Sequence, residues 1–236
     1  MKTKEKVLLS FHGDENLKKD LIEEMEAHQK ADDLIQGTYN QSNGRFKGCA
    51  VGCSIESLNR RRGLKLNYYN DHAGLGEAIG APEWLIRLQD SFFENLPKKY
   101  AKQFPVDFYQ AIPVGADLEP VKWRFCAFIL QENITLVLAL KIDDKLKEQV
   151  ITAIRKVLSV HEKAIAAGEW DESAAESAES AAWSAARSAA WSAARSARSA
   201  AWSAADSAAR SADSAERFVA YKRYADKLLD LLRESR

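Results

Sequence analysis

Residues 183–195 have the sequence WSAARSAAWSAAR, and the same pattern of a tryptophan or charged residue, a serine and one or two alanines recurs from residue 171 to residue 217. The segment contains neither glycine nor proline, and alanine has the highest helix propensity of all residues. Its serines recur at a mean spacing of about 3.7 residues, close to the helical period. The repeat therefore predicts one very long helix with a narrow alanine face.

The predicted helix is too long to be covered by one small domain. From residue 171 to residue 234 it would extend on the order of 95 Å, whereas a compact domain of the first 168 residues has a radius of gyration of roughly 15 Å. The alanine face of this helix needs a packing partner, and two arrangements would provide one. Either a second copy of the chain packs against it, or the helix bends back onto its own domain with Trp183, Trp191 and Trp202 as anchors.

Two further features qualify this interpretation of the C-terminal region. Residues 218–232 change to an ordinary amphipathic pattern, which predicts a docking end. Within the repeat, Arg187 and Arg195 join the tryptophans as candidate binding residues, and such surfaces can stack nucleic-acid bases. The acidic residues of the repeat outnumber its arginines, so the pattern favours a protein partner over nucleic acid.

Composition places the chain among soluble globular proteins of the cytoplasm. It has 236 residues, with 34 lysines and arginines balanced by 34 aspartates and glutamates, so no overall field directs it to nucleic acid or membranes. Its three cysteines are too few for a disulfide framework. The N-terminal apolar run is too short for a signal peptide, and residues 134–140 are too few to span a membrane.

Periodicity in residues 1–168 indicates a mainly helical domain, followed by the long helix over residues 169–236. Apolar spacing and end signals predict helices over residues 14–35, 83–95 and 143–167. Turn-forming residues between 38 and 48 predict a loop or small hairpin. The run 134–140 is compatible with a helix or a strand. We therefore expect an all-α fold.

Within the N-terminal domain, the stretch from Lys47 to Ile55 most resembles a functional site. Gly48, Cys49, Gly52 and Cys53 lie just after a turn and near the predicted start of a helix. A thiol at a helix N-terminus, close to Lys47, would have a lowered pKa and form a thiolate more readily.

A reactive Cys49 would also require a general base, and His72 and His28 are the candidates. The alternative interpretation is structural: the cysteines are small buried apolar side chains, the glycines permit close helix packing, and His28 is a core histidine. Cys49 and Cys53 lie four residues apart, but no second pair has zinc-like spacing, so the sequence predicts neither a metal site nor a cofactor.

Four stretches, together with the aromatic repeat, resemble a family of uncharacterised bacterial and bacteriophage proteins. They are residues 36–39 (QGTY), 48–53 (GCAVGC), 81–85 (APEWL) and 111–117 (AIPVGAD). The resemblance covers most of the chain and implies a cytosolic accessory protein, encoded by a bacterium or its phage. The resemblance implies no catalytic residues for this chain.

The leading functional prediction is therefore a non-enzymatic interaction protein, an inhibitor or adaptor, that forms a homo-oligomer through the long helix. Two alternatives stay open. One is a small cysteine-dependent hydrolase or transferase that uses Cys49. The other is a protein that sequesters a small molecule in a pocket around Gly48 to Cys53.

Overall fold

The computed structural model describes residues 7–39, 41–42, 46–68, 71–141, 143–171, 173 and 206–236. The repeat from residue 174 to residue 205 lies outside them, and with it the candidate binding residues Trp183, Trp191, Trp202, Arg187 and Arg195. The very long helix predicted over the repeat therefore stays a prediction, and the structure describes a helix only from residue 206 onward.

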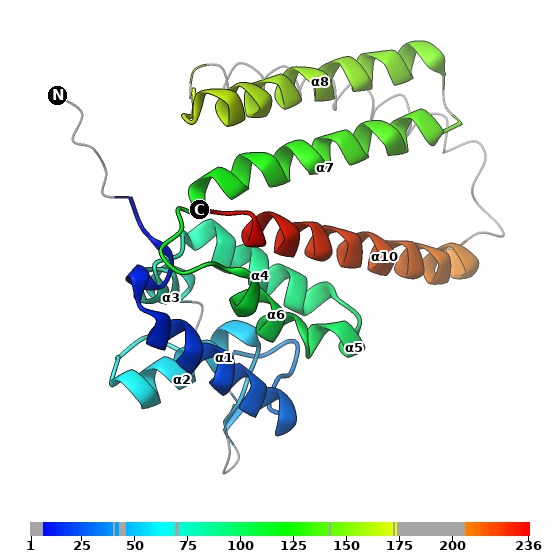
Figure 1. The fold of residues 1–236 in the computed structure, drawn as a ribbon. Helices are drawn as coiled ribbons and strands as arrows, with labels where there is room; N and C mark the ends of the chain where they lie inside the picture. Colours follow the sequence, from blue (N-terminus) through cyan, green and yellow to red (C-terminus); the bar gives the residue numbers. More distant parts are fainter. Residues whose placement is uncertain are drawn as a thin grey trace. The chain divides into compact units, whose positions relative to one another are not determined.

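The described residues are predominantly helical, which confirms the predicted all-α class (Figure 1). The N-terminal elements are η1 (Ser10–Gly13), α1 (Glu15–Lys30), β1 (Gln41–Ser42), β2 (Phe46–Lys47), α2 (Ala50–Arg62), α3 (His72–Ile79), α4 (Glu83–Asn95), α5 (Lys98–Ala101) and α6 (Phe104–Ala111). They are followed by α7 (Glu119–Ala139), α8 (Asp144–Ala167) and α10 (Asp206–Arg233). The two short strands form the small antiparallel hairpin that the turn residues predict.

The first helix begins where predicted but ends earlier. The Asp14 side chain caps it by accepting a hydrogen bond from the backbone N–H of Asn16 at 2.8 Å. The predicted end near Ile35 is wrong, because Asp32 adopts a left-handed backbone conformation with a φ of 58°. Beyond that turn, the N–H of Ile35 donates to the carbonyl of Gly48 at 2.9 Å, so this segment pairs with another part of the chain instead of continuing the helix.

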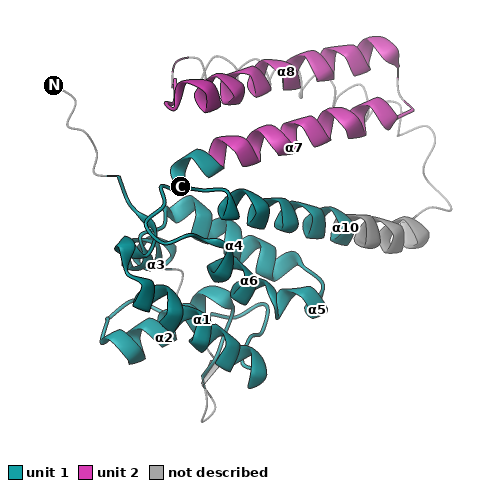
Figure 2. Cartoon of the chain, viewed as in Figure 1, with its two compact units in different colours: residues 1–121, 217–236 teal, residues 122–216 magenta. Residues whose placement is uncertain are grey.

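The chain divides into two compact units, shown in Figure 2. Unit 1 contains residues 1–121 and 217–236, and unit 2 contains residues 122–216. This division differs from the predicted boundary at residue 168. The physical reason is that the C-terminal part of α10 belongs to the core of the N-terminal domain.

The amphipathic C-terminal segment docks within unit 1. Leu228 and Leu232 are completely buried, and the ring of Tyr221 meets that of Phe92 edge-on with a centroid separation of 6.2 Å. The docked helix joins a core in which α1 packs against α2 and α6, while α4 packs against α2 and α3. The largest completely or almost completely buried side chains of that core include Phe11, Leu21, Met25, Ile55, Leu58, Leu75, Leu85, Ile86, Phe93, Phe108 and Tyr109.

Unit 2 contains most of α7 and all of α8, which run in opposite directions. At one end the rings of Trp123 and Trp170 stack at 6.4 Å, and the ring of His161 lies 5.1 Å from that of Trp170. At the other end residues 140–143 connect the helices. The run 134–140, for which sequence left helix and strand open, is the last part of α7 up to Ala139. None of the described helices combines the length and apolarity needed to cross a lipid bilayer.

We expect Leu228→Ala to lower the free energy of unfolding by about 2–5 kcal/mol, because a large side chain in the unit 1 core is lost and a cavity replaces it. Urea denaturation followed by circular dichroism measures this change. Val219→Ala is the matched control, since Val219 lies on the same helix and is 70% exposed. Equal effects of the two substitutions would show that α10 is not docked in this way.

Candidate functional site

The segment before α2 lies unusually close to the first turn of that helix. A Cβ atom at Gly48 or Gly52 would overlap the carbonyl oxygen of Tyr39. The backbone N–H of Cys49 also donates to the carbonyl of Thr38 at 2.6 Å. The glycines of the predicted site-like stretch are therefore required for close packing, and they bring residues 37–39 against the start of α2.

Cys49 occupies the predicted position at a helix N-terminus, but its thiol is not activated there. It is the N-cap of α2, and its Sγ accepts a hydrogen bond from the N–H of Gly52 at 3.4 Å. The residue is 1% exposed. Burial, followed by the nearby Asp90 carboxylate, raises the pKa of the Cys49 thiol to about 12. Lys47 cannot counter this, because its ammonium donates to the carbonyl of Asp32 at 3.0 Å.

His72, the first candidate base, is bound to Asp90 rather than to the thiol. Its Nε2 lies 3.0 Å from Asp90 Oδ2, and its ring meets the ring of Tyr39 edge-on. The Tyr39 hydroxyl donates to the same Asp90 oxygen at 3.2 Å. The Nδ1 of His72 is buried and has no hydrogen-bond partner. The geometry therefore assigns the proton to Nε2, which donates to Asp90.

His28, the second candidate base, belongs to a separate buried chain of polar groups. Its Nδ1 lies 3.4 Å from Asp33 Oδ2, and its Nε2 lies 3.2 Å from Ser57 Oγ. The order Asp33, His28, Ser57 resembles that of a hydrolase triad. However, Ser57 is 2% exposed, and its hydroxyl donates a hydrogen bond to the carbonyl of Cys53 at 2.9 Å. This chain is therefore a buried core network, in line with the structural interpretation of His28.

The structure brings Cys49 together with two carboxylates that the sequence did not single out. One ligand atom each from Cys49, Asp90 and Glu94 lie within 4.8 Å of one another, so these residues could hold a metal ion. Glu94 Oε2 accepts from the N–H of Gly37 at 2.7 Å. Burial, and secondarily Asp90, raises the pKa of the Glu94 carboxyl. The available sequence signal was the spacing of Asp90 and Glu94, which places both on one face of a helix.

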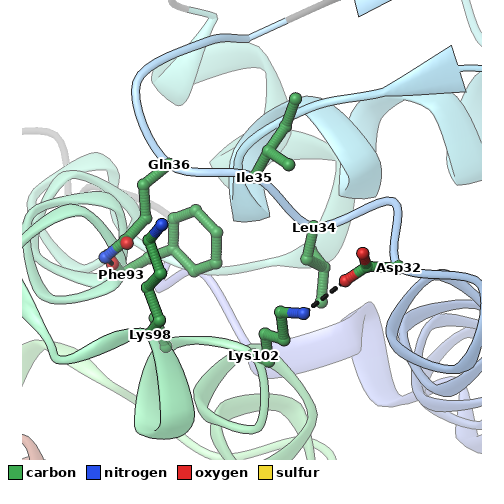
Figure 3. A pocket seen from close by; sticks show the side chains of 8 residues that line it. Asp32, Leu34, Ile35, Gln36, Phe93, Lys98 and Lys102 are labelled. Carbon is green, nitrogen blue, oxygen red and sulfur yellow. Dashed lines mark hydrogen bonds and ion pairs between the residues drawn. The ribbon is translucent and has the colours of Figure 1, made fainter.

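A separate pocket is lined in part by residues of the segment 32–36 (Figure 3). Its volume is about 260 Å³, and its apolar lining comes from Leu34, Ile35, Phe93 and Ala101. Lys102 is ion-paired with Asp32 at its edge, and Lys98 and Gln36 complete the lining. The small-molecule hypothesis expected a pocket around Gly48 to Cys53, but those residues do not line this one.

We expect native Cys49 to react with iodoacetamide on the order of a hundred-fold more slowly at neutral pH than the same cysteine in the unfolded protein. Its raised pKa leaves very little thiolate, and its burial restricts access. Mass spectrometry of the peptides gives the rate at each cysteine, and the reaction in guanidinium chloride is the control. Rapid native labelling of Cys49 would contradict the buried, protonated thiol.

Stability is expected to fall as the pH drops below about 6.5, the ordinary pKa of histidine. Burial lowers the pKa of His28 despite the opposing effect of Asp33, so the folded state favours the neutral imidazole. That contribution is present above the unfolded pKa and is lost as the pH falls toward the lowered folded value. Urea unfolding between pH 7.5 and 5.5 should show a smaller decline for His28→Gln than for wild type. An equal decline in the two proteins would contradict this contribution of His28.

The known proteins give no independent guide to this site. No protein-family model, curated protein or solved structure matches the chain. The resemblance to uncharacterised bacterial and phage proteins therefore stays a prediction, and the site has to be interpreted from its own chemistry.

Proposed function

We propose that the chain is a non-enzymatic protein-interaction protein and that unit 2 supplies an association surface. The observation that supports this most directly is the apolar end of α7, defined as Leu136, Leu138 and Leu140. These side chains are 56%, 57% and 50% exposed, respectively. Neighbouring exposed apolar side chains of this size are typical of interaction surfaces.

The apolar end of α7 differs from an ordinary surface helix. Residues 133–140 contain no charged side chain. Successive helical residues are rotated by about 100°, so Leu136 and Leu138 project from opposite sides of the helix. Most surface helices instead have one apolar stripe and one polar face. Exposure on opposite sides favours a partner that covers this end of the hairpin from more than one direction.

A second copy of the chain is the partner that we propose for this surface. Every copy carries the same uncharged end, and two such ends can meet without bringing like charges together. Symmetric dimers are also the commonest assemblies.

The very long helix predicted over the repeat is the second part of this assembly. Its support comes from the alanine composition and from α10, which begins within the repeat at Asp206. Close approach of two alanine faces would place the repeat's tryptophans and arginines at the rim.

The cellular setting follows from the resemblance and the composition. We place the protein in the bacterial cytoplasm or in the phage-infected host cell, where it would act as an accessory inhibitor or adaptor. The alternative of a cysteine-dependent hydrolase or transferase is less well supported, because Cys49 is buried and its pKa is raised to about 12.

Sequestration of a small molecule is the second candidate function. It is favoured by the pocket of Figure 3, where apolar walls lie beside the ammonium group of Lys98. Among the described residues, no ion pair is formed by Lys98, whereas Lys102 is paired with Asp32. A small carboxylate with an apolar body has the chemistry that such a pocket would recognise.

Leu136→Lys combined with Leu138→Lys is expected to shift the full-length protein from dimer toward monomer. Each lysine would have to be buried without a counter-charge in the proposed interface. Sedimentation velocity over a range of protein concentrations measures the shift, and Leu64→Lys in unit 1 is the control. A wild-type protein that stays monomeric, or a dimer unaffected by the double substitution, would refute association through this surface.

A further inference from the structure

We propose that Cys49, Asp90 and Glu94 bind one divalent transition-metal ion, of which Zn²⁺ is the best match. This inference concerns unit 1 and does not depend on the association surface proposed for unit 2. It rests on the geometry of the three side chains, on the way their neighbours orient them, and on their uncompensated charge.

The three ligand atoms are already grouped at nearly the separation that a metal requires. They lie within 4.8 Å of one another. Ligands of a tetrahedral zinc ion, at bond lengths of 2.0–2.3 Å, are about 3.5 Å apart. Side-chain rotations that close the group by about 1 Å would therefore complete three bonds. The fourth position would be left for a water molecule.

Each ligand comes from a well-supported helix. Cys49 is the N-cap of α2, and its Sγ accepts a hydrogen bond from the N–H of Gly52, which orients the thiol. Asp90 and Glu94 lie four residues apart on α4, so both carboxylates project from one face. Because α2 and α4 pack against each other, the group does not depend on a mobile loop.

The neighbours of the carboxylates resemble the outer shell of a metal site. Both Tyr39 and His72 bind Asp90 Oδ2, and the Gly37 N–H binds Glu94 Oε2. One oxygen of each carboxylate is thereby oriented by the protein. Carboxylate ligands in metal sites are held in this way by partners that do not touch the metal.

The other oxygen of Asp90 is consistent with a role in binding a cation. Asp90 Oδ1 is buried and has no hydrogen-bond partner. An unsatisfied buried oxygen of a carboxylate is costly, and such groups are rare in folded proteins. A metal ion bound by this oxygen would remove the penalty.

The charge of the group is also uncompensated. In the described part of the chain, neither carboxylate is ion-paired with a lysine or arginine. A divalent cation would supply the missing positive charge. On binding, the Cys49 S–H bond would break, its proton would pass to water, and a sulfur–metal bond would form.

Ligand type selects the class of metal. Calcium and magnesium prefer sets made only of oxygen ligands. A thiolate combined with carboxylates instead suits zinc, and Co²⁺ can replace zinc as a spectroscopic probe. Three protein ligands and one open position are also the arrangement found at many zinc sites that bind water.

The test uses the reduced full-length protein titrated with Co²⁺ and then with Zn²⁺. We expect a sulfur-to-cobalt charge-transfer band at one equivalent, its loss when Zn²⁺ is added, and release of a proton on binding. Cys49→Ser should abolish the band, and Glu94→Gln should weaken metal affinity on the order of ten-fold or more. Cys53→Ser is the matched control, because Cys53 is equally buried and lies outside the group, so it should leave the band unchanged.

A stability measurement keeps the test decisive if Cys49→Ser folds poorly. Zn²⁺ should raise the melting temperature of the wild type and of Cys53→Ser, but not that of Glu94→Gln, which retains the thiol and an acceptor for Gly37. Absence of a charge-transfer band in the wild type would overturn the proposal. It would equally fail if Glu94→Gln bound Zn²⁺ with wild-type affinity, or if Cys53→Ser were the substitution that abolished the band.

Discussion

The arrangement of unit 1 depends on the close approach of the Tyr39 backbone to the first turn of α2. Only glycine at positions 48 and 52 leaves room for the Tyr39 carbonyl oxygen. From this contact follow the position of the Tyr39 hydroxyl at Asp90 and that of the Gly37 N–H at Glu94. One steric constraint therefore sets the geometry of the thiol and carboxylate group, and residues just before this loop, from Asp32 to Gln36, line part of the pocket.

Unit 1 contains two buried polar groups that differ in their ligand chemistry. His28 is held between Asp33 and Ser57, and the Ser57 hydroxyl donates to a backbone carbonyl. The group around Cys49 instead combines a protonated thiol with two carboxylates. Among the described residues, this group brings three potential metal ligands within 4.8 Å of one another. For this reason the second group, and not the first, supports a ligand proposal.

The local sequence pattern predicted several helices well but did not decide the reactivity of the Cys49 thiol. The helices at 83–95 and near 143–167 were recognisable from apolar spacing, proline and glycine, since these signals act within a few residues. For Cys49, the same reasoning identified the helix N-terminus but left open whether the thiol is activated or is a buried structural side chain. A helix dipole contributes typically 0.3–1 kcal/mol at an exposed end, and complete burial beside Asp90 outweighs it.

By itself, the sequence determined the all-α class, most helix starts and the amphipathic C-terminal segment, because helix propensity and periodicity are properties of neighbouring residues. The tertiary structure decided that this segment closes the N-terminal domain, that α1 ends at Lys30, and that Cys49 meets Asp90 and Glu94 rather than a histidine. These outcomes depend on contacts between residues far apart in the chain, such as Ile35 with Gly48, Cys49 with Asp90 and Phe92 with Tyr221. Burial and charge act through space, so no local pattern could have revealed them.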